Sequence, residues 1–228
     1  RRKKNSGPSD APEQIREGAT AAVGEACAPN KAGKGHHDTD TGHPCSIGQP
    51  AGGFPPDDTP RLRPDAELKA MHRALASRMP ELSERQLDAF GDYAAGTYQE
   101  VNRALAAGET PAKGAGIVKV MEDAIRGAPE FEAPVATYRG IRLSKADEAA
   151  LMKEAQAAAE SGGELHMAGF TSTSLDYRVA NQFSRGGEAS VLFEISCKKG
   201  LYLGESAGNE KEKELLLHHG SRFRVAGV

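Results

Sequence analysis

The amino-acid sequence predicts an α+β domain, with a helical N-terminal half followed by a mixed or antiparallel β core. Two observations support this fold class. In the segment 83–126, apolar residues recur every three or four positions, which is the period of an amphipathic helix. In the segment 135–225, short runs of β-branched and aliphatic residues are separated by glycines and other turn residues. Helices that precede a series of strands are typical of an α+β domain.

Residues 83–105 are expected to form the first long helical segment. Ser83 and Gln86 have the spacing of a capping box, in which each side chain bonds the backbone N–H of the other residue. Gly91 and Gly96 weaken the middle of the segment. The sequence therefore leaves open whether this is one helix or two helices with a break.

Two further helices are expected at residues 114–126 and 144–159, and Gly162 with Gly163 ends the second of them. Five short runs are expected to form the strands of the domain. These runs span residues 135–139, 169–174, 191–195, 214–218 and 223–225. No internal repeat is visible, which favours a single domain.

The composition narrows the possible classes of protein. The 228 residues carry 29 Lys and Arg against 32 Asp and Glu, which gives a net charge of −3. A nucleic-acid-binding protein usually has a strong basic excess, so this balance does not favour one. No run approaches the roughly 18 consecutive apolar residues that a membrane-spanning helix needs. Three cysteines cannot build a disulfide scaffold, and their number fits a compartment that keeps thiols reduced.

Residues 1–60 differ from the rest of the chain because they hold 8 of the 13 prolines and 9 of the 26 glycines. With few large apolar side chains, this segment cannot bury enough surface to offset the entropy of ordering it. We expect a flexible linker or tail here, and a globular domain at residues 61–228. The sequence begins with Arg1 and not with Met, so we expect a fragment or a processed product. No apolar stretch follows Arg1 to Lys4, so we expect no signal peptide in this chain.

Two groups of histidines suggest metal ligands at first sight. The segment 36–45 holds three histidines and Cys45, but it lacks the paired ligand spacing of structural zinc sites, and we interpret it as a polar linker. His218 and His219 follow an aliphatic run, and we expect them at an exposed strand end. No metal is therefore expected. Cys197 is expected to pack in the core rather than to act as a nucleophile.

Three short motifs stand out, although each is weak alone: Tyr138-Arg139-Gly140, Ser172-Thr173-Ser174 and Glu212-Lys213-Glu214. In this order they resemble the R–S–E signature of bacterial mono-ADP-ribosyltransferase toxins. The Glu-x-Glu pair resembles the arginine-modifying branch, such as the enzymatic components of clostridial binary toxins. The similarity covers roughly residues 83–226 and includes further matching residues: Tyr93, Tyr98, Asn102, Leu105 and 180–183.

The resemblance implies that NAD is the co-substrate. Arg139 would hold its pyrophosphate, because a guanidinium forms a forked pair of charge-assisted bonds to phosphate. Gly140 would let the backbone approach the nicotinamide amide closely, and Phe183 would stack on the nicotinamide ring. The remaining candidates for NAD contacts are Tyr98, Asn102 and Arg185, with Arg142 as a weaker one.

The resemblance also assigns the catalytic groups. Glu214 directly precedes the aliphatic run, so it would stabilise the positive charge that develops on the ribose as the nicotinamide bond breaks. Glu212 would orient the acceptor guanidinium and help to remove its proton. Ser172 would hold Glu214 through its hydroxyl. Residues i and i+2 face the same side of a strand, but a strand that begins later leaves Glu212 on a turn. The pair Glu210 and Glu212 is an alternative register.

The expected reaction is transfer of ADP-ribose to an arginine on a protein of an attacked cell. Two alternatives remain open at this stage: a NAD glycohydrolase that uses water as acceptor, and an inactive NAD- or protein-binding module of the same fold. The resemblance further implies a secreted effector, delivered into the target-cell cytoplasm as part of a larger protein. The producing cell would then need a cognate inhibitor, or immunity, protein as a partner.

Overall fold

The computed structural model describes residues 62–112, 114–204 and 210–228. The linker prediction for residues 1–60, and the interpretation of the histidines at 36–45, lie outside the described residues. A five-stranded sheet with the order β4–β1–β3–β6–β5 forms the centre of the domain, and all its strand pairs are antiparallel. Its strands are β1 (Glu130–Leu143), β3 (Thr171–Ser174), β4 (Ala189–Lys199), β5 (Leu201–Tyr202) and β6 (Glu214–Leu217). Beside it, β2 (Glu164–Met167) and β7 (Ser221–Arg224) form a two-stranded antiparallel sheet.

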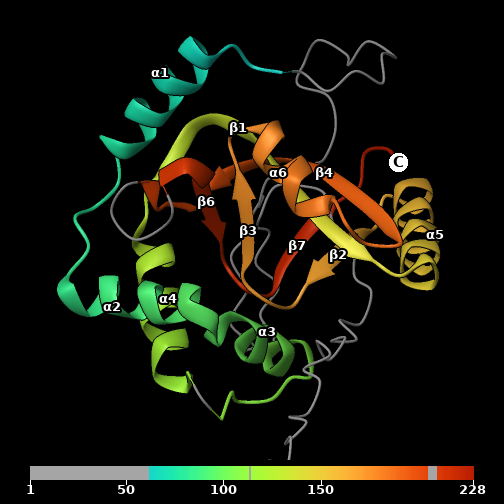
Figure 1. The fold of residues 1–228 in the computed structure, drawn as a ribbon, viewed down its shortest axis with the longest axis horizontal. Helices are drawn as coiled ribbons and strands as arrows, with labels where there is room; N and C mark the ends of the chain where they lie inside the picture. Colours follow the sequence, from blue (N-terminus) through green and yellow to red (C-terminus); the bar gives the residue numbers. More distant parts are fainter. Residues whose placement is uncertain (1–61, 113, 205–209) are drawn as a thin grey trace, which may run out of the picture.

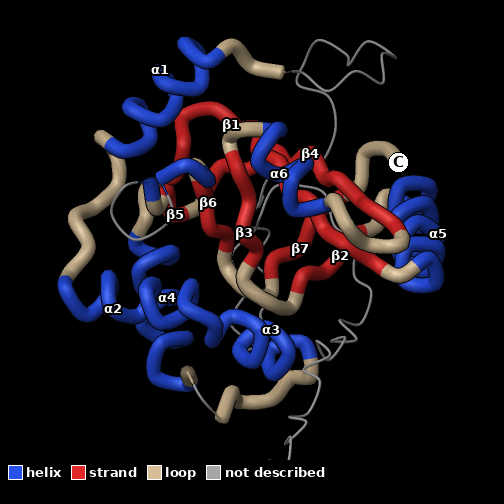
Figure 2. Tube along the Cα trace, viewed as in Figure 1, coloured by secondary structure: helices blue, strands red, loops and turns tan. Residues whose placement is uncertain are grey.

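Helices surround these sheets (Figure 1; helices are blue in Figure 2). Their bounds are α1 (Asp65–Ala76), α2 (Glu84–Asp92), α3 (Tyr98–Ala106), α4 (Ala115–Gly127), α5 (Lys145–Ser161) and α6 (Tyr177–Ser184). In Figure 1, α2, α3 and α4 lie together on one side of the sheet, while α5 lies at the far end. The predicted α+β fold is confirmed. Within the described residues, no helix is long and apolar enough to cross a membrane.

The helical segment that follows Ser83 is broken into two helices. This is one of the two alternatives that the sequence left open. The Ser83 Oγ atom accepts a hydrogen bond from the Gln86 backbone N–H, and the Ser83 backbone N–H donates one to Gln86 Oε1, so the predicted capping box is present. A π-helical turn (Tyr93–Thr97) separates α2 from α3. Gly96 lies inside this turn with φ +131°, a conformation that other residues rarely adopt. After this turn, α3 contacts the start of β3, where its Asn102 side chain accepts a hydrogen bond from the Phe170 backbone N–H.

Strand β1 is much longer than the predicted run at 135–139, and this prediction was wrong in extent. Its register against β4 shifts between Glu130 and Val135. Pro134 lies in this interval, and proline cannot donate to a strand ladder, so the sequence there does not show strand patterning. At the other end, β1 extends to Leu143 and carries Arg142 opposite Ser190 of β4.

Both faces of β6 are buried, which explains its uninterrupted aliphatic run. Leu215 and Leu217 belong to a core that also contains α1, α5 and the two-stranded sheet. Leu216 points to the opposite side, into a core formed with α2, α3 and α4. This burial continues one residue beyond the strand: His218 is buried rather than exposed, so its predicted surface position was wrong. Cys197 lies fully in the first core, as expected.

Helix α6 packs directly on the backbone of β1 at Gly140. A Cβ atom at this position would overlap the carbonyl oxygen of Ala180 and lie 2.8 Å from its carbonyl carbon and 3.0 Å from the backbone nitrogen of Ser184. Glycine is therefore needed here for contact between helix and strand. This requirement involves no ligand, in contrast to the role that the resemblance implies for Gly140.

We expect Gly140→Ala to lower the free energy of unfolding by about 3 kcal/mol, because the methyl group forces α6 away from β1. In a domain of this size, that corresponds to a fall in melting temperature of about 6–12 °C. Gly91→Ala is the matched control, since nothing lies within 4 Å of the methyl group it adds. Because Gly91 lies in a helix, Gly91→Ala should raise the free energy of unfolding by about 0.5–1 kcal/mol. Equal melting temperatures for the two variants would contradict this account of the α6–β1 contact.

Candidate active site

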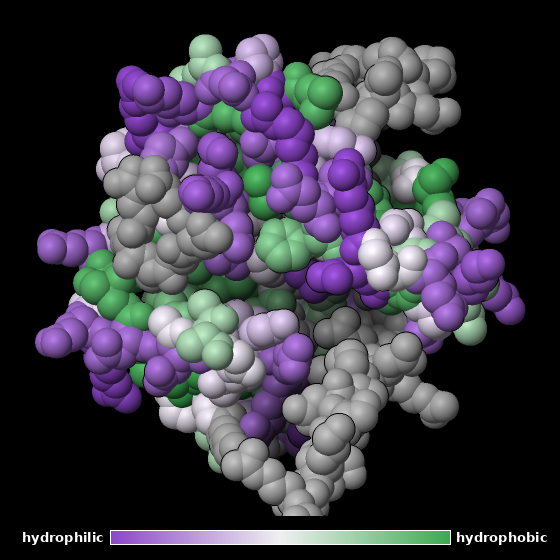
Figure 3. Space-filling model, viewed as in Figure 1, coloured by the Kyte–Doolittle hydropathy of each residue, from purple (hydrophilic) through white to green (hydrophobic). Residues whose placement is uncertain are grey.

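A cavity of about 670 Å³ opens between the helices α2–α3 and the central sheet. Its walls come from α2, the π-helical turn, α3, β1, β3 and α6, and from two glutamates, one that begins β6 and one two residues before it. On the face drawn in Figure 3, a furrow separates the helices below from the strands above, and both hydrophilic and hydrophobic residues border it. A cavity of this size with a mixed lining is typical of a site for a small molecule.

The two glutamates reach the cavity from different elements. Glu214 is the first residue of β6, while Glu212 ends a short 3₁₀ turn (Glu210–Glu212). Between them, Lys213 has φ +47°, in the left-handed region that residues other than glycine seldom occupy. The Ser174 hydroxyl donates a 2.6 Å hydrogen bond to the backbone carbonyl of Glu212 and fixes this turn to β3. Glu212 is thus on a turn, yet both carboxylates line the cavity.

Glu214 lies among groups that act on its charge. Burial raises the pKa of its carboxyl above the ordinary value of 4.5, and the charge of Glu212 raises it further. A hydrogen bond from the Ser172 hydroxyl and the positive charge of Arg139 act in the opposite direction. Ser172 lies on β3, which pairs directly with β6. The site therefore holds a carboxyl group whose protonation responds to its neighbours, as catalytic carboxyls commonly do.

Two arginines of β1 supply positive charge to the cavity. Arg139 donates a 2.9 Å hydrogen bond from its guanidinium to the backbone carbonyl of Ser172, so the side chain bridges from β1 to β3. Arg142 donates from Nε to the carbonyl of Phe183 at 3.0 Å and thereby contacts the end of α6. Each guanidinium has further donors, which could bind an anion in the cavity.

Aromatic rings border the cavity on two sides. Phe183 on α6 is 47% exposed and Tyr98 on α3 is 43% exposed, so each ring has a face open for stacking. The Asn102 carboxamide is engaged within the protein: its NH₂ group donates to the Tyr93 hydroxyl at 2.9 Å, and its oxygen accepts from the backbone N–H of Phe170 at 3.0 Å. Asn102 therefore joins the helical wall to the start of β3.

The cavity brings together eight of the nine site residues expected from the sequence: Glu212, Glu214, Ser172, Arg139, Gly140, Phe183, Asn102 and Tyr98. The ninth, Arg185, is exposed at the C-terminal end of α6 and is not among the lining residues. Its phosphate contact stays a prediction. Arg142, the weaker candidate in the sequence, does line the cavity. The predicted strand ended at residue 139, so the sequence did not show that Arg142 lies on the same strand as Arg139.

A cavity lined by two carboxylates and two guanidiniums can bind an anionic molecule and stabilise positive charge that develops on it. Comparison with known proteins identifies the family of the chain. A sequence model of ADP-ribosyltransferase exoenzymes matches residues 68–228, which is most of the chain. The chain belongs to this family. Exoenzyme T of Pseudomonas aeruginosa is 35% identical over 144 residues, a stretch that covers 63% of the chain and 29% of that protein.

Solved structures show the same fold at low sequence identity. The Vis toxin, an ADP-ribosyltransferase from Vibrio splendidus, superimposes with a TM-score of 0.54 at 21% identity, covering 73% of the chain and 80% of Vis. The C3 exoenzyme of Clostridium limosum gives 0.55 at 17%, covering 75% and 90%. Exoenzyme S of Pseudomonas aeruginosa, bound to human 14-3-3 protein beta and to carba-NAD, gives 0.50 at 24%, covering 68% and 78%. These structures show that the fold is shared, and the match of residues 68–228 to the family model shows that the domain is an ADP-ribosyltransferase exoenzyme domain.

Proposed function

We propose that the domain transfers ADP-ribose from NAD to an arginine side chain of a target protein and releases nicotinamide. The observation that carries this proposal is that Glu212 and Glu214 line one cavity together with Arg139. A single carboxylate suffices to split NAD. A second carboxylate beside it gives an incoming guanidinium a place to bind and a base to receive its proton.

The chemistry of the lining fits NAD. Its pyrophosphate is an anion, and Arg139 and Arg142 can bind it through charge-assisted hydrogen bonds. The exposed ring of Phe183 can stack on the flat nicotinamide, which carries a positive charge before cleavage. The carba-NAD bound to Exoenzyme S, which has the same fold, supports this choice of co-substrate.

Each glutamate has its own part in the proposed reaction. As the bond from ribose to nicotinamide breaks, positive charge develops on the ribose, and the Glu214 carboxylate stabilises it. The Ser172 hydroxyl and the Arg139 guanidinium help to keep that carboxylate ionised. Glu212 binds the acceptor arginine and takes its proton as the guanidinium nitrogen bonds to the ribose. An arginine needs such a base because its guanidinium stays protonated at physiological pH.

The deciding experiment incubates the protein with labelled NAD and agmatine, a small guanidine that the Vis toxin binds in a crystal. We expect labelled ADP-ribosyl-agmatine, and in a target-cell lysate a protein labelled on arginine by mass spectrometry. Nicotinamide release with free ADP-ribose alone would assign the protein as a NAD glycohydrolase. Absence of any NAD turnover would indicate that the domain is an inactive binding module.

We expect Arg139→Ala to raise the Michaelis constant for NAD about 10- to 150-fold, because a charge-assisted phosphate contact contributes about 1.5–3 kcal/mol. Arg139→Lys should recover little, since an ammonium cannot reproduce the planar fork that also bonds the Ser172 carbonyl. Arg222→Ala, an exposed arginine of β7, is the control. An unchanged Michaelis constant in Arg139→Ala would rule out Arg139 as the phosphate contact.

We also propose that residues 1–60 are not needed for catalysis, and that the domain reaches its target cell as part of a larger secreted protein. Exoenzyme T is a longer protein, since the matched stretch covers 29% of it.

A truncated chain must keep Arg63, whose guanidinium donates to the carbonyls of Leu175 at 2.8 Å and Ala136 at 2.9 Å. A chain that begins at Arg61 should retain the kcat for NAD. A large loss of kcat with intact NAD binding would show that the segment shapes the site.

A further inference from the structure

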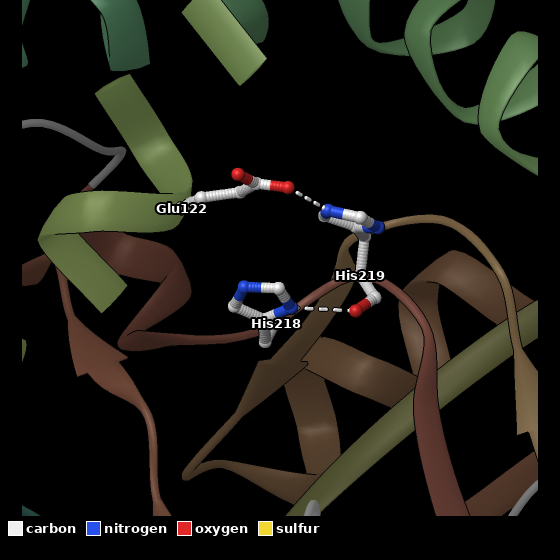
Figure 4. Close-up of side chains that lie close together, drawn as sticks. All are labelled: Glu122, His218 and His219. Carbon is white, nitrogen blue, oxygen red and sulfur yellow. Dashed lines mark hydrogen bonds and ion pairs between the residues drawn. The ribbon is translucent and has the colours of Figure 1, made fainter. Parts of the chain in front are cut away.

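A second cluster of polar side chains lies behind the cavity, where helix α4 meets the turn between β6 and β7. It consists of Glu122 on α4 and of His218 and His219 in the turn (Figure 4). One potential ligand atom from each residue lies within 4.8 Å of the other two. Two imidazoles and a carboxylate are a ligand set that zinc commonly takes, with water in the fourth position.

His218 is the member that points to a ligand. Its side chain is buried, with 7% of the residue exposed. Nδ1 lies 2.6 Å from the carbonyl oxygen of His219, an acceptor, so Nδ1 carries the proton and Nε2 keeps its lone pair. Nε2 is buried and has no hydrogen-bond partner among the described residues. In Figure 4 this nitrogen lies on the side of the ring that faces Glu122.

The hydrogen bond of His218 suits a metal ligand. A histidine binds metal through a ring nitrogen that carries no proton, and the bond from Nδ1 to the His219 carbonyl leaves Nε2 in that form. A backbone carbonyl that holds the other nitrogen is the usual second contact of a metal-binding histidine, because it fixes both the tautomer and the direction of the ring.

His219 and Glu122 complete the set from the solvent side. The His219 Nε2 atom and a Glu122 carboxylate oxygen form a short hydrogen bond. Their side chains are 21% and 19% exposed, which leaves a path by which an ion can enter. The two imidazole rings stack with centroids 4.6 Å apart and an angle of 27° between their planes. The His218 ring therefore lies beside the ring that bonds Glu122.

We propose that Glu122, His218 and His219 bind a divalent zinc ion that clips α4 to the β6–β7 turn. His219 and Glu122 bond each other, and neither bonds the buried Nε2 atom of His218. The ion would be the partner of this atom. The clip would also support the cavity, because the His219 ring contacts Phe170 edge to face at 5.1 Å and Phe170 lines the cavity. This site stands apart from the proposed catalytic groups, and its test does not depend on NAD turnover.

The test uses the full chain with His36→Gln, His37→Gln and His43→Gln, so that the other histidine group of the sequence cannot bind the metal. Cobalt(II) serves as a spectroscopic probe for the zinc site, and zinc affinity follows from competition with a chromophoric chelator. We expect one equivalent of metal per chain and visible cobalt absorption of a four- or five-coordinate site. Zinc should also raise the melting temperature of this parent chain.

Glu122→Gln and His218→Gln should each weaken zinc binding by more than about 100-fold, since even the loss of a ligand's outer hydrogen-bond partner costs about 10- to 100-fold. Asp123→Asn is the matched control: it removes the same charge from the next residue of α4, which is paired with Lys119. Glu122 is partly exposed, so its variant should fold even if His218→Gln does not. A parent chain that binds no zinc, or a Glu122→Gln variant that binds as the control does, would overturn the proposal.

Discussion

Glu214→Gln is expected to lower nicotinamide release about 10³-fold, both with an arginine acceptor and without one. The substitution keeps the shape of the side chain but removes the negative charge that stabilises the ribose as it becomes positive. Both transfer and hydrolysis pass through this bond cleavage, so both should fail together. The measurement is nicotinamide release with and without agmatine. Substantial residual hydrolysis in this variant would contradict the role assigned to Glu214.

The same substitution should stabilise the folded domain. Folding raises the pKa of Glu214, mainly through burial, so the ionised carboxylate is less favourable in the folded state than in the unfolded chain. A group of this kind favours folding at pH below its unfolded pKa, and this contribution is lost as the pH rises through its folded pKa. At about pH 7, Glu214→Gln should therefore raise the free energy of unfolding by about 0.5–2 kcal/mol.

A control and a pH series separate this effect from a general change. Glu154→Gln removes an exposed carboxylate of α5, and it should alter neither activity nor melting temperature. The gain from Glu214→Gln should disappear below about pH 4, where the carboxyl is protonated in both states. In the wild type, nicotinamide release should fall on the acid side at a higher pH than an ordinary carboxyl would give. A lower melting temperature for Glu214→Gln at neutral pH would contradict the electrostatic account.

The catalytic groups could be found from the sequence because each lies in a short motif with a distinctive residue order. The sequence alone does not show how these motifs meet. Arg139, Ser172 and Glu214 come together because β3 pairs with β1 on one side and with β6 on the other, with Tyr138 opposite Ser174 and Ser174 opposite Glu214. That strand order depends on contacts between distant segments, which no local pattern of residues shows.

Other features depend on conformations that no local pattern reveals. The geometry of i and i+2 on a strand does not explain why Glu212 lines the cavity, because Lys213 adopts a left-handed conformation there. Glycine or asparagine would have signalled such a turn, but lysine does not. The position of His218 likewise depends on a distant segment. Its ring lies near Glu122 on α4, which is nearly a hundred residues earlier in the chain. The sequence placed His218 as the last residue of a strand, one residue beyond the observed end of β6, and wrongly at the surface.

Glu212→Gln is expected to separate the two reactions of the site. It should lower modification of arginine by about 10²–10⁴-fold, the usual cost of losing a positioned base. It should leave much of the slow hydrolysis of NAD, because water can still reach the ribose and Glu214 still stabilises the positive charge. The measurement pairs label transfer to agmatine with nicotinamide release when no acceptor is present.

The electrostatics of the pair add a signature that a general loss of structure would not give. The charge of Glu212 raises the pKa of Glu214, so removing that charge should move the acid limb of the hydrolysis profile to lower pH. Glu154→Gln should leave this limb in place. Loss of hydrolysis in Glu212→Gln as complete as in Glu214→Gln would show that the roles are not divided. If Glu210→Gln abolished transfer while Glu212→Gln did not, the acceptor carboxylate would be the one two residues earlier.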